Sequence, residues 1–339
     1  MKGPAENVLG TIGDTPLIRL KRYLQDASVE LHAKVEYANP GSSAKDRPAF
    51  YMLRKAIEKG DVTASSTIVE SSSGNMGIGL AQACCYYGLP FICVVDPRAQ
   101  EHNLAIMRAY GTRIELVKQP DADTGDFLVA RVNRVRQLLQ SIPNAYWPDQ
   151  YANRANPTSH ARGTIREIFS ALDGRLDYLF VATSSTGTAS GCQHFLKEIG
   201  SSAKVVAVDA AGSVLFGGLP GERLIPGMGA GRVSELAAAA KFDEVTRVTD
   251  LDCVVGCRKL VQREAILAGG SAGGVLAAIE QRVDALAGST CVAILHDSGR
   301  SYLDTVYSDS WVEATLGCAP ENLASLIAGY KPEMVSVAW

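Results

Sequence analysis

One lysine in this 339-residue chain, Lys45, lies where a turn meets the start of a helix. The preceding run Asn39-Pro40-Gly41-Ser42-Ser43 has the composition of a turn, and apolar residues then recur at helical spacing from Phe50 to Ile57. A single lysine is usually a solvated surface residue. A partly buried lysine has a lowered pKa, so its amine can act as a nucleophile and form a Schiff base. The other loops of the chain decide between these two interpretations.

Two further loops connect an apolar strand to a helix and carry small or hydroxyl side chains. The loop Ser184-Ser185-Thr186-Gly187-Thr188 can turn its backbone N–H groups toward an anion at the start of the next helix. For one such loop alone, a hydroxyl-rich N-cap is the ordinary interpretation. The loop 71–77 has the same placement. Its Asn75 amide can donate to a ring oxygen or a carboxylate, or can be a turn residue beside Gly74.

The segment Gly269-Gly270-Ser271-Ala272-Gly273-Gly274 matches the G-x-S-x-G pattern of hydrolases, in which a strand precedes the serine. Here a helix is expected before the segment, and the one histidine downstream, His296, is directly followed by Asp297. Two adjacent residues are poorly placed to supply two positions of a catalytic triad. Ser271 at a helix N-terminus can instead hydrogen-bond a heterocyclic nitrogen.

The composition argues against several classes of protein. A net charge of −3 and a pI of about 6.0 give no general attraction to nucleic acid or anionic lipid. No apolar run approaches the length of a membrane span. The eight cysteines form no C-x-x-C pair and the five histidines do not cluster, so we expect neither a disulfide framework nor a metal site. We expect a cytoplasmic protein that binds neither nucleic acid nor membrane.

Apolar runs with the character of strands alternate with helical patterns along the chain. The expected strands include 31–37, 91–95, 113–117, 178–183 and 244–248, and the expected helices include 101–110, 127–139, 159–172 and 189–199. Strands that alternate with helices of about ten to fifteen residues predict an α/β fold with two parallel sheets flanked by helices. In such folds ligands bind where strands end and helices begin, which is where the loops described above lie.

Together these segments resemble the fold-type II pyridoxal-phosphate enzymes of the cysteine synthase and cystathionine β-synthase family, which share the fold of the tryptophan synthase β subunit. Six blocks occur in the family's order, at 12–17, 39–47, 72–75, 150–157, 184–188 and 269–273. The resemblance implies two doubly wound parallel-sheet domains with pyridoxal 5′-phosphate between them. It implies a larger cofactor-binding domain (1–40 and 150–310), a smaller mobile domain that carries the substrate-carboxylate loop (41–149), and a C-terminal extension (311–339).

The resemblance also implies roles for single residues. Lys45 matches the lysine that binds the cofactor covalently and later transfers protons, Asn75 matches the asparagine that hydrogen-bonds the cofactor's 3′ oxygen, and Ser271 matches the serine that faces the pyridine nitrogen. The phosphate loop matches Ser184, Ser185, Thr186, Gly187 and Thr188, and the substrate α-carboxylate positions match Ser72, Ser73 and Gln150. A serine opposite the ring nitrogen makes the ring a moderate electron sink, which favours β-elimination followed by β-addition.

Departures from the cysteine synthases bear on the substrates. Met76 stands where those enzymes usually carry a threonine that helps to hold the carboxylate, and Tyr151 stands where they usually carry a phenylalanine. With Ile225-Pro226-Gly227-Met228-Gly229, these departures resemble the siderophore branch of the family, the N-(2-amino-2-carboxyethyl)-L-glutamate synthases. Two anionic substrates require a pocket lined by cationic or hydrogen-bond-donating side chains, here called its walls. The candidates for these walls are Arg131, Tyr151, Ser185 and Arg223.

The resemblance therefore implies a transferase that joins O-phospho-L-serine to the amine of L-glutamate, a step toward L-2,3-diaminopropionate in siderophore biosynthesis. A cysteine synthase that uses O-acetyl- or O-phospho-L-serine with sulfide is the alternative within the family. A catalytically silent paralogue that binds a partner is the alternative from another class. The family usually forms homodimers, and we expect one here. The apolar end of the chain, 335–339, can close the active-site cleft or pack on a second subunit.

Overall fold

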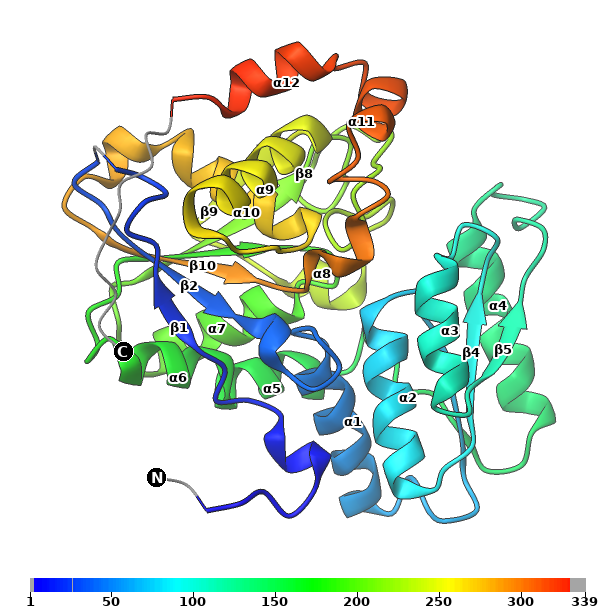
Figure 1. Ribbon diagram of the computed structural model, residues 1–339. Coiled ribbons are helices and arrows are strands. Elements are labelled where there is room, and N and C mark those ends of the chain that lie inside the picture. The colour runs from blue at the N-terminus through cyan, green and yellow to red at the C-terminus, as the bar shows by residue number, and fades with distance from the viewer. Residues whose placement is uncertain (1–2, 26, 330–339) are drawn as a thin grey trace.

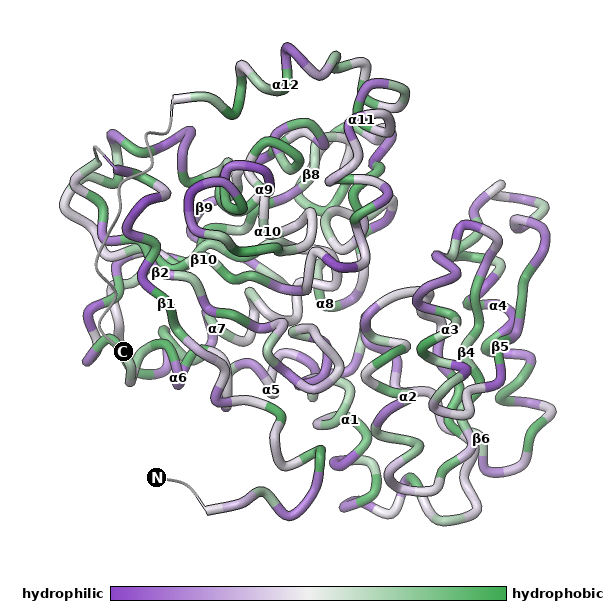
Figure 2. The backbone as a smooth tube through the Cα atoms, in the orientation of Figure 1, coloured by the Kyte–Doolittle hydropathy of each residue, from purple (hydrophilic) through white to green (hydrophobic). Residues whose placement is uncertain are grey.

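The computed structural model describes residues 3–25 and 27–329, and it contains two sheets that lie in separate halves of the molecule (Figure 1). The predicted apolar end at 335–339 lies outside the described residues. Helices pack on both faces of each sheet, as expected for strands that are apolar on both sides (Figure 2). The α/β class and the two parallel-sheet domains are confirmed, whereas the domain boundaries at 41 and 150 remain predictions.

The larger sheet has six strands in the order β1-β2-β10-β7-β8-β9. Their bounds are β1 Leu17–Arg19, β2 Glu30–Val35, β7 Tyr178–Ala182, β8 Lys204–Ala210, β9 Glu244–Val248 and β10 Thr290–Leu295. All neighbouring pairs are parallel except β1 and β2, which are antiparallel, so β1 adds an antiparallel edge that the prediction of parallel sheets did not include. The carboxyl ends of β7 and β10 lead directly into the loops that hold the candidate site.

The smaller sheet has four parallel strands in the order β5-β4-β3-β6. Their bounds are β3 Thr67–Ser71, β4 Phe91–Val95, β5 Arg113–Leu116 and β6 Ala145–Tyr146. One face packs on helices α1 Asp46–Lys59, α2 Asn75–Tyr87 and α3 Glu101–Ala109, and the other packs on α4 Phe127–Ser141. Helix α2 follows β3 at once, so the loop 71–77 lies at the carboxyl end of a central strand.

The remaining helices surround the larger sheet. Their bounds are α5 Ala155–Arg162, α6 Thr164–Ala171, α7 Gly187–Glu198, α8 Glu235–Ala239, α9 Asp250–Glu264, α10 Gly270–Glu280, α11 Asp309–Leu316 and α12 Pro320–Ile327, with 3-10 turns η1 Val8–Thr11, η2 Glu36–Ala38, η3 Val283–Leu286 and η4 Gly299–Tyr302. Helices α5, α6 and α7 cover one face, and α9 and α10 cover the other (Figure 1). Within the described residues, no helix combines the length and the apolar content needed to cross a membrane.

The single helix predicted over 159–172 is wrong, because Gly163 divides it into α5 and α6. A Cβ atom on Gly163 would lie 2.7 Å from Nη1 of Arg47, so the break leaves room for that guanidinium. Arg47 on α1 is 5 % exposed and pairs with Glu36 at 2.7 Å and with Glu167 at 2.6 Å. Lys34 on β2 pairs with Glu167 at 2.6 Å. This buried charge cluster ties α1 to β2, η2 and α6.

Helices α9 and α10 meet through glycine. A Cβ atom added to Gly256 would lie 2.2 Å from the carbonyl oxygen of Gly273, and one added to Gly273 would lie 2.0 Å from that of Cys253. No side chain fits between backbones this close. The contact fixes the start of α10, and with it Ser271, directly against α9.

Candidate active site

Lys45 lies at the N-cap position of α1 and is partly buried. Its backbone N–H donates to Ser43 Oγ at 3.1 Å, and its carbonyl oxygen accepts from the Ala49 N–H at 3.0 Å. Burial lowers the pKa of Lys45, and the Asp297 carboxyl acts in the opposite direction. The chain therefore places at this junction a lysine whose amine is more easily deprotonated than a surface lysine, as a nucleophile or proton carrier requires.

The predicted phosphate loop, 184–188, follows β7 and enters α7, whose N-cap is Thr186. Thr186 has a left-handed φ of 66°, which β-branched residues rarely adopt, and its buried Oγ1 has no hydrogen-bond partner in the described part of the chain. A Cβ atom on Gly187 would lie 2.1 Å from Asn156 Oδ1. An unpaired hydroxyl and the free N–H groups of a helical first turn together form a site for an anion.

A single cavity joins this loop to Lys45, Asn75 and Ser271, as predicted, and adds Gly227, His296 and Asp297. Ser271 lies in the first turn of α10 and is 3 % exposed. Burial and the nearby Lys45 lower the pKa of His296 to about 3, so its ring is neutral at ordinary pH. The cavity thus combines one amine, one acid, several hydroxyls and a neutral imidazole.

Asn75 and Asp297 meet inside this cavity from different halves of the fold. Asn75 opens α2 beside the smaller sheet, and Asp297 follows β10 of the larger sheet. The Asn75 Nδ2 group donates to Asp297 Oδ2 at 2.8 Å, and the Tyr302 hydroxyl donates to the same oxygen at 2.6 Å. This contact connects the two halves next to Lys45.

A second, more polar pocket extends from Lys45 and is lined by the predicted residues Ser72, Ser73, Asn75, Met76, Arg131, Gln150, Tyr151, Ser184 and Ser185. Ser72 Oγ accepts from the Gly77 N–H at 3.1 Å, so α2 holds this hydroxyl in place. Met76 is 2 % exposed and belongs to the apolar core of the smaller half, so it packs there as well as lining the pocket. These groups can hold a carboxylate beside the Lys45 amine.

Glu70 supports the part of this pocket that carries Gln150. Glu70 is 1 % exposed and accepts from Trp147 Nε1 at 2.9 Å and from the Gln150 N–H at 3.3 Å. Burial raises the pKa of Glu70 to about 7. A buried carboxyl at the end of β3 therefore links the loop 71–77 to the segment of Gln150 and Tyr151.

Two arginines share one carboxylate at the edge of the pocket. Arg131 Nε lies 3.3 Å from Asp96 Oδ2, and Arg98 Nη2 lies 3.2 Å from the same oxygen. Both arginines line the pocket, with side chains 13 % exposed for Arg131 and 66 % exposed for Arg98. Two guanidinium charges against one carboxylate leave this edge positive, which suits an anionic ligand.

Arg223, the fourth residue predicted for these walls, lies outside the lining of both pockets. Its Nη1 group donates to the Gly212 carbonyl oxygen at 2.6 Å and to that of Gly221 at 3.4 Å. Arg223 therefore closes the Gly-rich loop on itself. A role of Arg223 in the substrate walls stays a prediction.

Sequence reasoning missed several groups that the structure brings into these pockets, among them Arg98, Gln100, Asn103, Asp297, Ser301 and Tyr302. A usable signal existed for Asp297, because it follows an apolar strand and ligands gather at the carboxyl ends of parallel strands. Arg98 lies just beyond β4, so the same rule indicates it.

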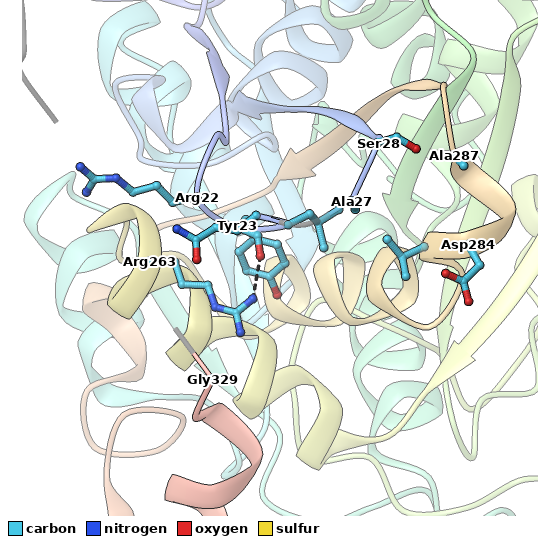
Figure 3. A pocket seen from close by; sticks show the side chains of 11 residues that line it. Arg22, Tyr23, Ala27, Ser28, Arg263, Asp284, Ala287 and Gly329 are labelled. Atoms are coloured by element: carbon cyan, nitrogen blue, oxygen red, sulfur yellow. Dashed lines mark hydrogen bonds between the residues drawn. The ribbon is translucent and has the colours of Figure 1, made fainter. Parts of the chain in front are cut away.

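A separate hollow shares no lining residue with the pockets around Lys45 (Figure 3). Arg263 lies across it and donates to the Tyr23 carbonyl oxygen at 2.6 Å, with Glu280 as a second partner at 3.4 Å. Burial raises the pKa of Tyr23 well above its ordinary value, so its hydroxyl stays neutral. We therefore place the candidate active site in the two pockets around Lys45.

The residues of the first cavity fit pyridoxal phosphate. The unpaired Thr186 hydroxyl and the start of α7 suit its phosphate, the lysine of lowered pKa suits its aldehyde, and Ser271 offers a neutral partner for a ring nitrogen. The cofactor supplies an electron sink for bonds at the substrate's α-carbon. The protein supplies the binding groups, their orientation and the proton carriers.

Comparisons with known proteins agree with this reading. Residues 8–297 match the family model described as pyridoxal-phosphate dependent enzyme. An O-acetylserine dependent cystathionine beta-synthase from Helicobacter pylori is similar, with 28 % sequence identity, a TM-score of 0.83, and coverage of 91 % of this chain and 100 % of that one. A hydrogen sulfide-producing enzyme from Fusobacterium nucleatum is similar at 30 % identity, a TM-score of 0.82, and coverage of 88 % and 100 %.

The family match spans both sheets and every loop of the Lys45 cavity. The similar structures extend over most of the chain and the whole of each relative. The alternative of a catalytically silent paralogue is therefore set aside. The chain belongs to the pyridoxal-phosphate dependent enzyme family and is a fold-type II enzyme of the β-replacement type that uses pyridoxal phosphate.

Proposed function

We propose that the enzyme joins O-phospho-L-serine and L-glutamate to give N-(2-amino-2-carboxyethyl)-L-glutamate and phosphate, as a step toward L-2,3-diaminopropionate for a siderophore. The observation that carries the proposal is the positive edge of the substrate pocket. Arg131 and Arg98 share Asp96 there, in the same lining as Lys45. A phosphate leaving group and a dicarboxylate amine both need such charge, whereas acetate and sulfide need less.

Two hydroxyl groups in the lining of the pocket support the same substrates. Tyr151 is a phenol at the wall of the pocket, and burial raises the pKa of its hydroxyl, which keeps it a hydrogen-bond donor. Ser185 is 3 % exposed and lines both pockets. We assign these two hydroxyls and Arg131 to the leaving phosphate and the glutamate carboxylates.

The roles proposed for the inner residues follow from their places. Ser72, Ser73 and Gln150 hold the α-carboxylate of the first substrate, and Met76 bounds that site without donating. Lys45 removes the α-proton and returns a proton after the new C–N bond has formed. Asn75, Ser271 and the loop 184–188 bind the cofactor. We also propose that the enzyme is cytoplasmic and forms a homodimer. Light scattering tests the homodimer.

The alternative product is cysteine. The two similar structures are named as an O-acetylserine dependent cystathionine beta-synthase and as a hydrogen sulfide-producing enzyme, and both names concern sulfur chemistry, which supports a cysteine synthase as the second candidate. Sulfide is small and needs no site for two carboxylates. The alternative thus predicts that the arginines at the pocket edge have little influence on the second substrate.

The test is product analysis with the purified holoenzyme. O-Phospho-L-serine and O-acetyl-L-serine are each supplied with L-glutamate or with sulfide, and phosphate, acetate and the amino-acid products are measured by mass spectrometry. We expect phosphate and N-(2-amino-2-carboxyethyl)-L-glutamate to form fastest. Faster formation of cysteine from either serine ester, with no product from glutamate, would replace our proposal with the cysteine synthase alternative.

A further inference from the structure

The Asp297 carboxyl is an unusual group for the interior of this protein. Asp297 is 6 % exposed, and its two carboxyl oxygens differ in their hydrogen bonds. Oδ2 accepts from both Asn75 and Tyr302, whereas buried Oδ1 has no hydrogen-bond partner in the described residues. A buried carboxylate that is only partly satisfied destabilises the fold, so its presence in an active-site cavity points to a role in function.

Several contacts hold Asp297 in one position. Its carbonyl oxygen accepts from the Gly269 N–H at 2.9 Å, and it forms an isolated antiparallel bridge with Ser43. A Cβ atom on Gly269 would lie 1.9 Å from Asp297 Oδ1, so only glycine leaves space for the carboxyl. The acid is therefore fixed between the loop of Lys45 and the start of α10.

Asp297 is the acid that faces Lys45 within the described residues. The other titratable groups around these two residues are His160, His296, Tyr302 and Cys257. Burial lowers the pKa of both histidines and raises the pKa of the tyrosine and the cysteine, so all four are neutral near pH 7. Lys45 and Asp297 line the same two pockets, and Asp297 is the carboxyl in the described lining that stabilises the Lys45 ammonium form. Burial raises the pKa of Asp297, and the positive charge of Lys45 opposes this shift.

We propose that Asp297 is a positioning residue that aims the Asn75 amide into the cofactor cavity and acts as the counter-charge of Lys45. Asn75 Nδ2 carries two hydrogens, and Asp297 takes one, which leaves the other for the cofactor. The acceptor lies on the larger half of the fold and the donor on the smaller half, so the bond aligns the halves where Lys45 must work. This inference rests on the proposed role of Lys45 and is independent of the identity of the substrates.

The test compares Asp297→Asn with Asp297→Ser in the full-length chain after the cofactor has been removed. Asparagine keeps the shape and an acceptor but removes the charge, and serine also avoids placing an amide against Gly269. The reactivity of Lys45 toward an amine-acylating reagent is measured across pH by mass spectrometry. Removal of the counter-charge destabilises the ammonium, so we expect the midpoint to fall by about one pH unit, with tenfold more free amine below the midpoint.

A second readout is the affinity for pyridoxal phosphate, measured by titration and followed by absorbance. We expect it to weaken by about tenfold in both variants, because the Asn75 amide loses its charged acceptor. Exposed Asp304→Asn, near Asp297 in sequence but outside both pockets, is the matched control and should change neither readout. An unchanged Lys45 midpoint in a folded Asp297 variant would overturn the proposal, whichever substrates the enzyme uses.

Discussion

The cofactor cavity and the outer substrate pocket share Lys45 but are built in different ways. The cavity is lined mainly by short side chains and glycines at or near helix starts, and most of these residues are buried. The outer pocket depends on long side chains such as Arg98 and Arg131, which come from separate segments and reach water. Backbone geometry thus positions the groups of the cavity, whereas in the proposed function long side chains select the substrates.

Removing Lys45, which lines both regions, should have the largest effect. Lys45→Ala deletes the nucleophile and the proton carrier, and we expect turnover to fall by a factor of roughly 10³ or more. The fold should persist, because the hydrogen bonds of Lys45 to Ser43 and Ala49 are made by its backbone. Circular dichroism and product assays check both points. Substantial turnover in this variant would remove Lys45 from the mechanism.

The next largest effect should come from backbone geometry in the cavity. Gly187→Ala places a methyl group 2.1 Å from Asn156 Oδ1, so the loop must shift, and we expect the affinity for pyridoxal phosphate to fall by roughly a hundredfold. Gly200→Ala is a poor control because its φ is positive. Lys197→Ala, at an exposed position near the end of α7, is the control. Normal affinity in Gly187→Ala would mean that the loop is less rigid than the comparison requires.

A smaller and more selective effect is expected in the outer pocket. Arg131→Gln should raise KM for O-phospho-L-serine or L-glutamate by about tenfold, because one charge-assisted contact is lost, and should leave cofactor affinity unchanged. Arg113→Gln, whose side chain is 63 % exposed and pairs with Glu115, is the matched control. Equal losses of cofactor and substrate affinity in Arg131→Gln would show that the two regions are not separable.

The smallest effect on turnover should come from Glu70, where pH acts on stability. Its folded-state pKa of about 7 lies above the ordinary value of 4.5, so the native state favours the protonated form. The stabilisation that the folded state gains from this raised pKa is fully present below pH 4.5 and is lost as the pH rises through 7. Between pH 4.5 and 8, the unfolding free energy of the native protein should fall by up to about 3 kcal/mol relative to that of Glu70→Gln. Urea unfolding at several pH values measures the unfolding free energies of the two proteins. The same pH dependence in the native protein and in Glu70→Gln would contradict the prediction.

The sequence could reveal the cavity more readily than the pocket, for a physical reason. Ser271 and the loop 184–188 act through local geometry at strand ends and helix starts, which leaves a mark in neighbouring residues. Arg98 and Asp297 also follow strand ends, which indicates a nearby ligand, but the groups that meet them there come from distant segments that the neighbouring residues do not reveal. The backbone acceptors of Arg223 and the break at Gly163 were not predicted, because backbone or distant partners determine both.

The glycine contact between α9 and α10 limits which parts of this enzyme can change during evolution. Because Gly256 and Gly273 meet backbone to backbone, a substitution at either one forces the helices apart, and no change in the other can restore the contact. The placement of Ser271 is thereby shielded from drift in the surrounding side chains. Residues at the mouth of the site, and with them the nucleophile that the enzyme accepts, can then change during evolution while the reaction centre keeps its position.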